Sequence, residues 1–177
     1  MRSFESGSII HKHGVAAMKD IYKIKPNVFL MIDRRLNGNL VVYEAVVAQG
    51  AMEKIDVYWL DLDPKYKARA RKRGRMHDRD EFCKMDHYAY GITVTHQAKT
   101  MWEFHFKRFP SQKFSVRLEQ DGNTRCYTQI DDVEHKVHHV HIEDKPALGF
   151  LWPTVAYVEM VTYSLTTRAL TTTRIKN

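Results

Sequence analysis

The stretch that decides the fold is residues 101–119, MWEFHFKRFPSQKFSVRLE, in which apolar and polar side chains alternate twice. The apolar positions of the two alternating runs are Trp102, Phe104, Phe106, Phe114, Val116 and Leu118. Successive side chains of a strand point to opposite faces of a sheet, so alternation places one set in a core and the other in water. The stretch therefore predicts two neighbouring strands of a half-buried antiparallel sheet.

Similar segments on both sides predict further strands. The expected ranges are 27–33, 40–48, 55–62, 90–96, 124–130, 136–142, 154–163 and a threonine-rich stretch at 166–175. Turn residues separate several of them, at Asn37-Gly38-Asn39, Asp121-Gly122-Asn123 and Asp131-Asp132. Short links favour pairing between strands adjacent in sequence. The predicted fold is mainly β, an antiparallel up-and-down barrel or curled sandwich of about 8–10 strands with one short internal helix and an N-terminal extension.

The domain organisation follows from length and from two segments that depart from the strand pattern. A chain of 177 residues suits one core, and no linker or internal repeat divides it. Residues 1–26 are interpreted as an N-terminal extension, with apolar residues at helical spacing between Val15 and Tyr22. Residues 27–177 are expected to form a single β-rich domain with a basic insertion at 64–77.

The internal helix is expected directly after the basic insertion. Asp78 followed by Glu81 resembles an N-cap with a reciprocal acid three residues on. Phe82, Met85 and Tyr88 then recur at the spacing of one helix face, which predicts that they point inward.

Composition limits the setting of the protein. Hydrophobic content of 44% and charged content of 28% are typical of a folded globular domain. No apolar stretch approaches the roughly 20 residues that span a bilayer, and residues 1–25 lack the apolar core of a signal peptide. Cys83 and Cys126 form no CxxC pair, so buried free thiols are favoured over a single disulfide. We expect a cytoplasmic or other reducing compartment and no cofactor.

The net charge of +7 arises in one segment, because seven cations without an acid account for all of it (7 − 7 = 0 for the rest). These cations are Lys65, Lys67, Arg69, Arg71, Lys72, Arg73 and Arg75. Guanidinium groups bind phosphate bidentately, and clustered cations gain affinity by releasing counterions. The segment predicts docking onto a nucleic acid, an acidic protein or an anionic membrane, with a solvated loop as the alternative. Tyr66 alone interleaves it, which disfavours base stacking.

A histidine cluster is the second candidate site. His135, His139 and His141 are expected to point to one side of the strand predicted around residues 136–142, and Glu143 is at the same alternate positions. Parallel imidazoles at such spacing can ligate a metal ion. The residues on the other side of this strand are more apolar and would face the core. The alternative is therefore that the histidines are exposed and bind no metal. Such a cluster could also make an interface sensitive to pH near 6.

Several short motifs, in the same order along roughly residues 27–163, resemble the family called domain of unknown function 4833. The matching residues are Ile32-Asp33-Arg34, Asn37, Asn39, Val41-Val42-Tyr43, Val57-Tyr58-Trp59, Tyr88-Ala89-Tyr90-Gly91, Pro153, Val155, Tyr157, Val158 and Glu159. The resemblance implies a single β-rich domain, and it supplies neither a reaction nor catalytic residues. The chain departs from the family pattern in its N-terminal extension and its basic insertion.

The polar and aromatic residues of these motifs are the third candidate site. They are Arg34, Tyr43, Tyr58, Trp59, Tyr88, Tyr90 and Glu159. In a barrel they could line a ligand cavity with apolar walls and a few orienting polar groups. The alternative is that the aromatic rings fill the core while their polar tips reach the backbone or water.

These observations favour a non-enzymatic β-barrel-like module that docks through its basic segment into a larger assembly. One alternative is a lipocalin-like carrier of small apolar ligands, and another is a metal-dependent enzyme centred on residues 135–143. No nucleophile with a nearby histidine and acid, and no glycine-rich phosphate loop, is visible in the sequence. The strand expected at 154–163 is apolar on both of its faces. It is therefore either buried on both faces or covered by the N-terminal segment or by another subunit, so homo-oligomerisation stays open.

Overall fold

The computed structural model describes residues 25–34, 40–60, 79–81, 84–144 and 155–176. The segment of helical spacing between Val15 and Tyr22, the expected turn at Asn37-Gly38-Asn39, the basic segment and Cys83 lie outside these residues. Within them, no helix is both long and apolar enough to cross a membrane.

The described residues form eleven strands of one sheet and one short helix. The strands are β1 (Val28–Arg34), β2 (Leu40–Ala48), β3 (Ala51–Leu60), β4 (Arg79–Glu81), β5 (Ile92–Gln97), β6 (Met101–Phe106), β7 (Phe109–Leu118), β8 (Thr124–Ile130), β9 (Val133–Asp144), β10 (Val155–Ser164) and β11 (Leu170–Lys176), and the helix is α3 (Lys84–Tyr90). The expected helix start at residues 78–81 is wrong, because Arg79–Glu81 pair with β3 as a strand. The helix itself is confirmed a few residues later.

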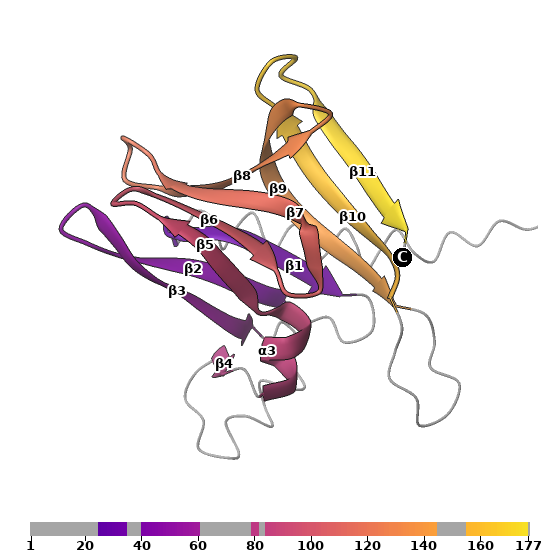
Figure 1. The fold of residues 1–177 in the computed structure, drawn as a ribbon, viewed down its shortest axis with the longest axis horizontal. Coiled ribbons are helices and arrows are strands. Elements are labelled where there is room, and N and C mark those ends of the chain that lie inside the picture. Colours follow the sequence, from indigo (N-terminus) through magenta and orange to yellow (C-terminus); the bar gives the residue numbers. More distant parts are fainter. Residues whose placement is uncertain (1–24, 35–39, 61–78, 82–83, 145–154, 177) are drawn as a thin grey trace, which may run out of the picture.

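The sheet consists of two meanders joined through β9 (Figure 1). Strands β4, β3, β2 and β1 form one meander, and β5 to β8 form the other. One edge of β9 pairs with β8 near its start and with β1 further along, while its other edge pairs with β10. The curled, barrel-like β fold is confirmed. The contact of β1 with β9 is parallel, which the expected up-and-down order did not include.

Two-residue turns join the strands of two hairpins. Gln49 and Gly50, with φ of 51° and 69°, connect β2 to β3. Asp131 and Asp132, with φ of 50° and 61°, connect β8 to β9, as expected for turn residues. Two successive positive φ angles suit the right-handed twist of a hairpin. The first turn lets β3 begin at Ala51, four residues before its expected start.

The main core lies between the two meanders. Phe29 of β1 contacts Phe104 of β6 with ring centroids 5.9 Å apart, and Tyr43 of β2 contacts Phe106 at 5.6 Å. The alternating stretch behaves as predicted, because its apolar side chains join this core. The buried members are Trp102, Phe104, Phe106, Phe114 and Val116, and Leu118 is partly buried.

A second, smaller cluster lies on the opposite face of β1, β2 and β3. Its buried members are Val28, Met31, Leu40, Val42 and Tyr58. Both faces of β1 and β2 are therefore buried, which explains why these two strands are apolar at successive positions instead of alternating.

Candidate functional site

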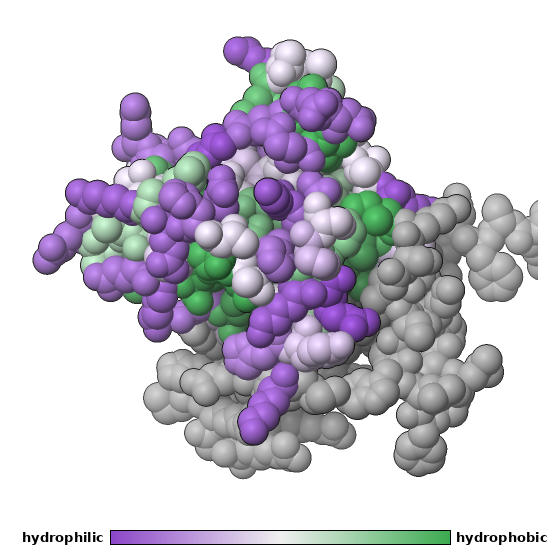
Figure 2. Space-filling model, viewed as in Figure 1, coloured by the Kyte–Doolittle hydropathy of each residue, from purple (hydrophilic) through white to green (hydrophobic). Residues whose placement is uncertain are grey.

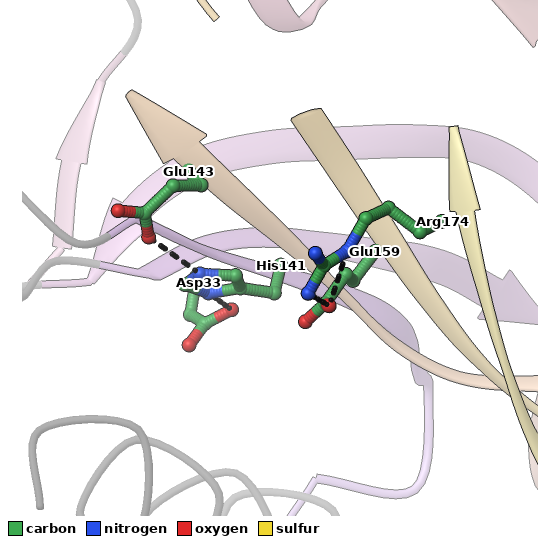
Figure 3. A network of polar contacts seen from close by, with 5 residues as sticks. All are labelled: Asp33, His141, Glu143, Glu159 and Arg174. Carbon is green, nitrogen blue, oxygen red and sulfur yellow. Dashed lines mark hydrogen bonds and ion pairs between the residues drawn. The ribbon is translucent and has the colours of Figure 1, made fainter. Parts of the chain in front are cut away.

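His141 lies between two carboxylates on the face of the sheet opposite the main core. Its Nδ1 is 2.9 Å from Oδ1 of Asp33, and its Nε2 is 3.3 Å from Oε2 of Glu143 (Figure 3). Asp33 is brought to this point by the parallel pairing of β1 with β9, in which it is the partner of His141. All three side chains are nearly buried, with 10–12% of their side-chain surface exposed.

This geometry favours a protonated imidazole. A neutral imidazole can donate from only one of its nitrogens, whereas an imidazolium donates from both. Burial alone lowers the pKa of His141, but the hydrogen bonds and charges of Asp33 and Glu143 outweigh it and leave the pKa raised. Because both nitrogens are engaged by acids, the group is suited to holding a proton and joining β1 to β9 more than to accepting a proton from a substrate.

A second ion pair lies beside the first. Glu159 of β10 is the cross-strand partner of both His141 and Arg174, the latter on β11. Nε of Arg174 donates to Oε1 of Glu159 at 2.9 Å, and its guanidinium also lies 4.1 Å from the ring of Tyr157. The polar network thus crosses four neighbouring strands on one face (Figure 3).

Two expectations about the histidines are wrong. His135, His139 and His141 are buried, with 3–8% of their surface exposed, not directed into water. They also do not share one face. Val161 pairs with His139 and the next residue pairs with Val137, so His138 is an extra residue in β9. This bulge shifts the parity, and it leaves His135 on the main-core side with His139 and His141 on the other.

The histidines meet different partners as a result. A ring nitrogen of His135 lies 3.1 Å from the hydroxyl of Thr162, and His138 and His139 approach within 2.9 Å through their Nδ1 atoms. In the described part of the chain, no group of three or more His, Cys, Asp or Glu side chains is arranged to hold a metal ion.

The aromatic residues of the third candidate site pack against other side chains and backbone groups of the protein. The hydroxyl of Tyr43 donates to the carbonyl of Tyr90 at 2.7 Å, and burial raises the pKa of Tyr43. The ring of Trp59 packs edge-on against Tyr90, with centroids 5.2 Å apart. These contacts match the alternative in which rings fill the core and polar tips find partners.

Tyr58 belongs to a separate polar contact on the other face. Its hydroxyl donates to Glu44 at 2.7 Å and accepts from the ammonium of Lys25 at 3.0 Å. Burial, the largest cause, raises the pKa of Tyr58, Lys25 opposes the rise, and Glu44 adds to it.

The remaining described members are dispersed. Tyr88 is 58% exposed and accepts a hydrogen bond from Arg108, so the expected inward orientation on the helix is wrong for it. Glu159 belongs to the network of Figure 3, and the side chain of Arg34 lies outside the described part of the structure. The six candidates whose side chains are described therefore do not gather in one place.

Sequence reasoning placed Glu143 beside His141 but missed the second partner, Asp33. The available signal was Asp33, a single acid at the end of the apolar strand VFLMID. A carboxylate beside so apolar a run is usually paired when it is buried. Its partner lies 108 residues away, and only the parallel pairing of β1 with β9 identifies it.

The basic segment lies between β3 and β4 in the sequence, and the structure describes the two strands that flank it. Leu60 is the last residue of β3, and it pairs directly with Arg79, the first residue of β4. The chain therefore leaves and rejoins the sheet at adjacent points on the margin formed by β4.

Fold and site together define a class: a curled, mainly β domain with an aromatic core and a partly buried ion-pair network on the face of the sheet opposite that core. The chain belongs to the family described as Domain of unknown function (DUF4833), whose model matches residues 30–174. No curated protein and no solved structure matches it.

Proposed function

We propose that this protein is a non-enzymatic binding module that docks, through its basic segment, onto an acidic partner or other polyanion in a larger assembly. The observation that carries the proposal is the concentration of charge. All of the net charge of +7 comes from residues 65–75, and the strands that flank this segment are paired with each other at the sheet margin. A local cluster of cations attached to a neutral, folded body supports electrostatic docking.

The contacts of the described residues favour this proposal over its two alternatives. A carrier of apolar ligands needs an open interior, whereas Phe104 stacks on Phe114 at 5.6 Å and meets Phe29 across the core at 5.9 Å. A metal-dependent enzyme on residues 135–143 needs its histidines together, whereas the bulge in β9 separates His135 from His141.

The first test replaces all seven cations with Gln in the full chain and recovers its partners by affinity capture and mass spectrometry. A matched control removes seven exposed cations elsewhere, namely Lys54, Lys84, Lys99, Lys107, Arg108, Lys113 and Arg168. We expect the first variant to lose the partners that the control retains. Recovery of the same partners by both variants would contradict the proposal.

A second measurement uses random-sequence duplex DNA as a polyanion probe. Affinity of the natural chain for this DNA should fall between about 50 and 200 mM salt. The logarithm of the association constant, plotted against the logarithm of the salt concentration, should have a slope near −0.9 per phosphate neutralised. The seven-Gln variant should lose this salt dependence, while its thermal unfolding should stay close to that of the natural chain because the core is unchanged.

A further inference from the structure

Three described strands have a pairing neighbour on only one side: β4, β5 and β11. Strand β4 has three residues, and the ladder of β5 with β6 is irregular between Val94 and His96. Strand β11 pairs with β10 over seven consecutive residues without a shift in register. Short or bulged edges resist further pairing, whereas a long regular edge accepts another strand. Among the described edge strands, β11 is therefore the one best suited to pair with a further strand.

The composition of β11 also suits pairing. Its middle is the β-branched run Thr171–Thr173, and it contains no proline. Its cations, Arg174 and Lys176, are confined to the C-terminal half, and Arg174 is engaged by Glu159 of the neighbouring strand. The first four residues of the edge thus carry no charge that would repel an incoming strand.

Exposed apolar side chains gather at the same place. Among the described residues, four large hydrophobic side chains are exposed, and three of them belong to the hairpin of β10 and β11. They are Tyr163 (36% exposed), Leu165 (45%) and Leu170 (64%), and Tyr163 pairs with Leu170. Figure 2 shows a mostly hydrophilic face with separate hydrophobic patches, one of them toward the top of the view, where this hairpin lies in Figure 1.

We propose that β11 binds the β11 of a second copy of this chain, antiparallel, so that the sheet continues across a two-fold axis near Thr173. In this register Thr172 lies opposite Arg174 of the second copy, and Leu170 lies opposite its Lys176. The cations of each copy then face the uncharged half of the other. A parallel, in-register arrangement would place Arg174 opposite Arg174 and Lys176 opposite Lys176 of the second copy. Like charges directly opposite each other destabilise a strand pair.

The strand's own charges therefore favour an identical partner in the antiparallel direction. Two-fold pairing uses the same patch on both copies and leaves neither β11 edge open, so assembly stops at the dimer. It also sets Thr171 against Ile175 and Thr173 against Thr173, which are favourable cross-strand pairs of β-branched residues. The interface does not involve the basic segment, so the two proposals can fail separately.

The test introduces a negative or a positive charge at Thr172, which is exposed and lies opposite Arg174 of the second copy in the proposed register. Thr172→Glu should tighten the dimer and Thr172→Lys should weaken it, each by roughly twofold to thirtyfold because every substitution acts in two symmetric pairs. Sedimentation equilibrium of the full chain measures the dissociation constant. The control places the same residues at Thr93, exposed on the β5 edge, and should leave the constant unchanged.

Three outcomes would overturn the inference. The natural chain could remain monomeric up to about 100 μM, a concentration at which even a weak specific dimer is populated. The two Thr172 variants could shift the dissociation constant in the same direction. The Thr93 variants could change it as much as the Thr172 variants do.

Discussion

His141 illustrates how a single residue acquires its role from its neighbours. On β9 it is one of several histidines, but Asp33 of β1 and Glu143 of β9 contact its two ring nitrogens. Its cross-strand partner on β10 is Glu159, which binds Arg174 of β11. An imidazolium between two acids joins strands that no turn connects. Losing the charge on His141 leaves two nearly buried carboxylates without it, which is unfavourable.

Replacing His141 with Gln should therefore destabilise the protein in a pH-dependent manner. Because the pKa of His141 is raised in the folded state, its contribution is complete below the unfolded pKa of about 6.5 and is lost as pH rises through the folded pKa. We expect a loss of about 1–3 kcal/mol near pH 6, measured by urea unfolding, and a smaller loss near pH 9. Equal losses at both values would contradict the ion-pair interpretation, and His96→Gln, at an exposed position, is the control.

At the scale of elements, two glycines end segments for different reasons. Gly91 follows α3 and donates from its backbone to the carbonyl of His87 at 3.1 Å. A Cβ on Gly91 would lie 2.0 Å from that same oxygen. Gly50, in the turn between β2 and β3, has open space around it, and its φ of 69° is the only constraint.

Gly91→Ala should consequently destabilise the protein more than Gly50→Ala. The Gly50 variant should lose about 1 kcal/mol, the usual strain of a left-handed backbone with a Cβ. The Gly91 variant must also displace the backbone at the end of α3, so its loss should exceed about 2 kcal/mol. Urea unfolding of both variants decides the order, and a reversed order would show that the end of α3 is easily rearranged.

For the whole molecule, β9 is the strand that connects the other parts of the sheet. It pairs with β8 from one meander, with β1 from the other and with β10 along its opposite edge. The shared core, to which both meanders contribute aromatic rings, reinforces this connection. Neither meander can therefore keep its packing after the other unfolds.

We expect a single cooperative unfolding transition, which tryptophan fluorescence can test. Trp59 lies on β3 and Trp102 on β6, so each reports on one meander. Two variants, Trp59→Phe with Trp152→Phe and Trp102→Phe with Trp152→Phe, retain one reporter each. In both, the fluorescence midpoint in urea should coincide with the midpoint from far-UV circular dichroism. Separate midpoints would show that the meanders unfold independently.

Much of the fold could be predicted because the pattern of apolar and polar residues within a strand shows which of its faces are buried. Alternation at 101–119 identified two half-buried strands, and successive apolar residues at Val28–Ile32 belong to a strand buried on both faces. The features that the sequence did not predict were a very short strand and a single extra residue. The three residues of β4 carry no periodicity, and the extra residue His138 changes parity without any signal in composition.

Local alternation, turn residues and the cluster of cations are properties of neighbouring residues, and they were sufficient for the β class, most strand positions and the location of the net charge. The union of β1 with β9 was decided only in three dimensions, because it joins residues more than a hundred positions apart. The network around His141 follows from that arrangement. The position of β11 at the margin of the described strands follows from its pairing with β10. A sequence lists which groups can pair, but the tertiary structure alone determines which are close enough to do so, since ion pairs and hydrogen bonds act over a few ångströms.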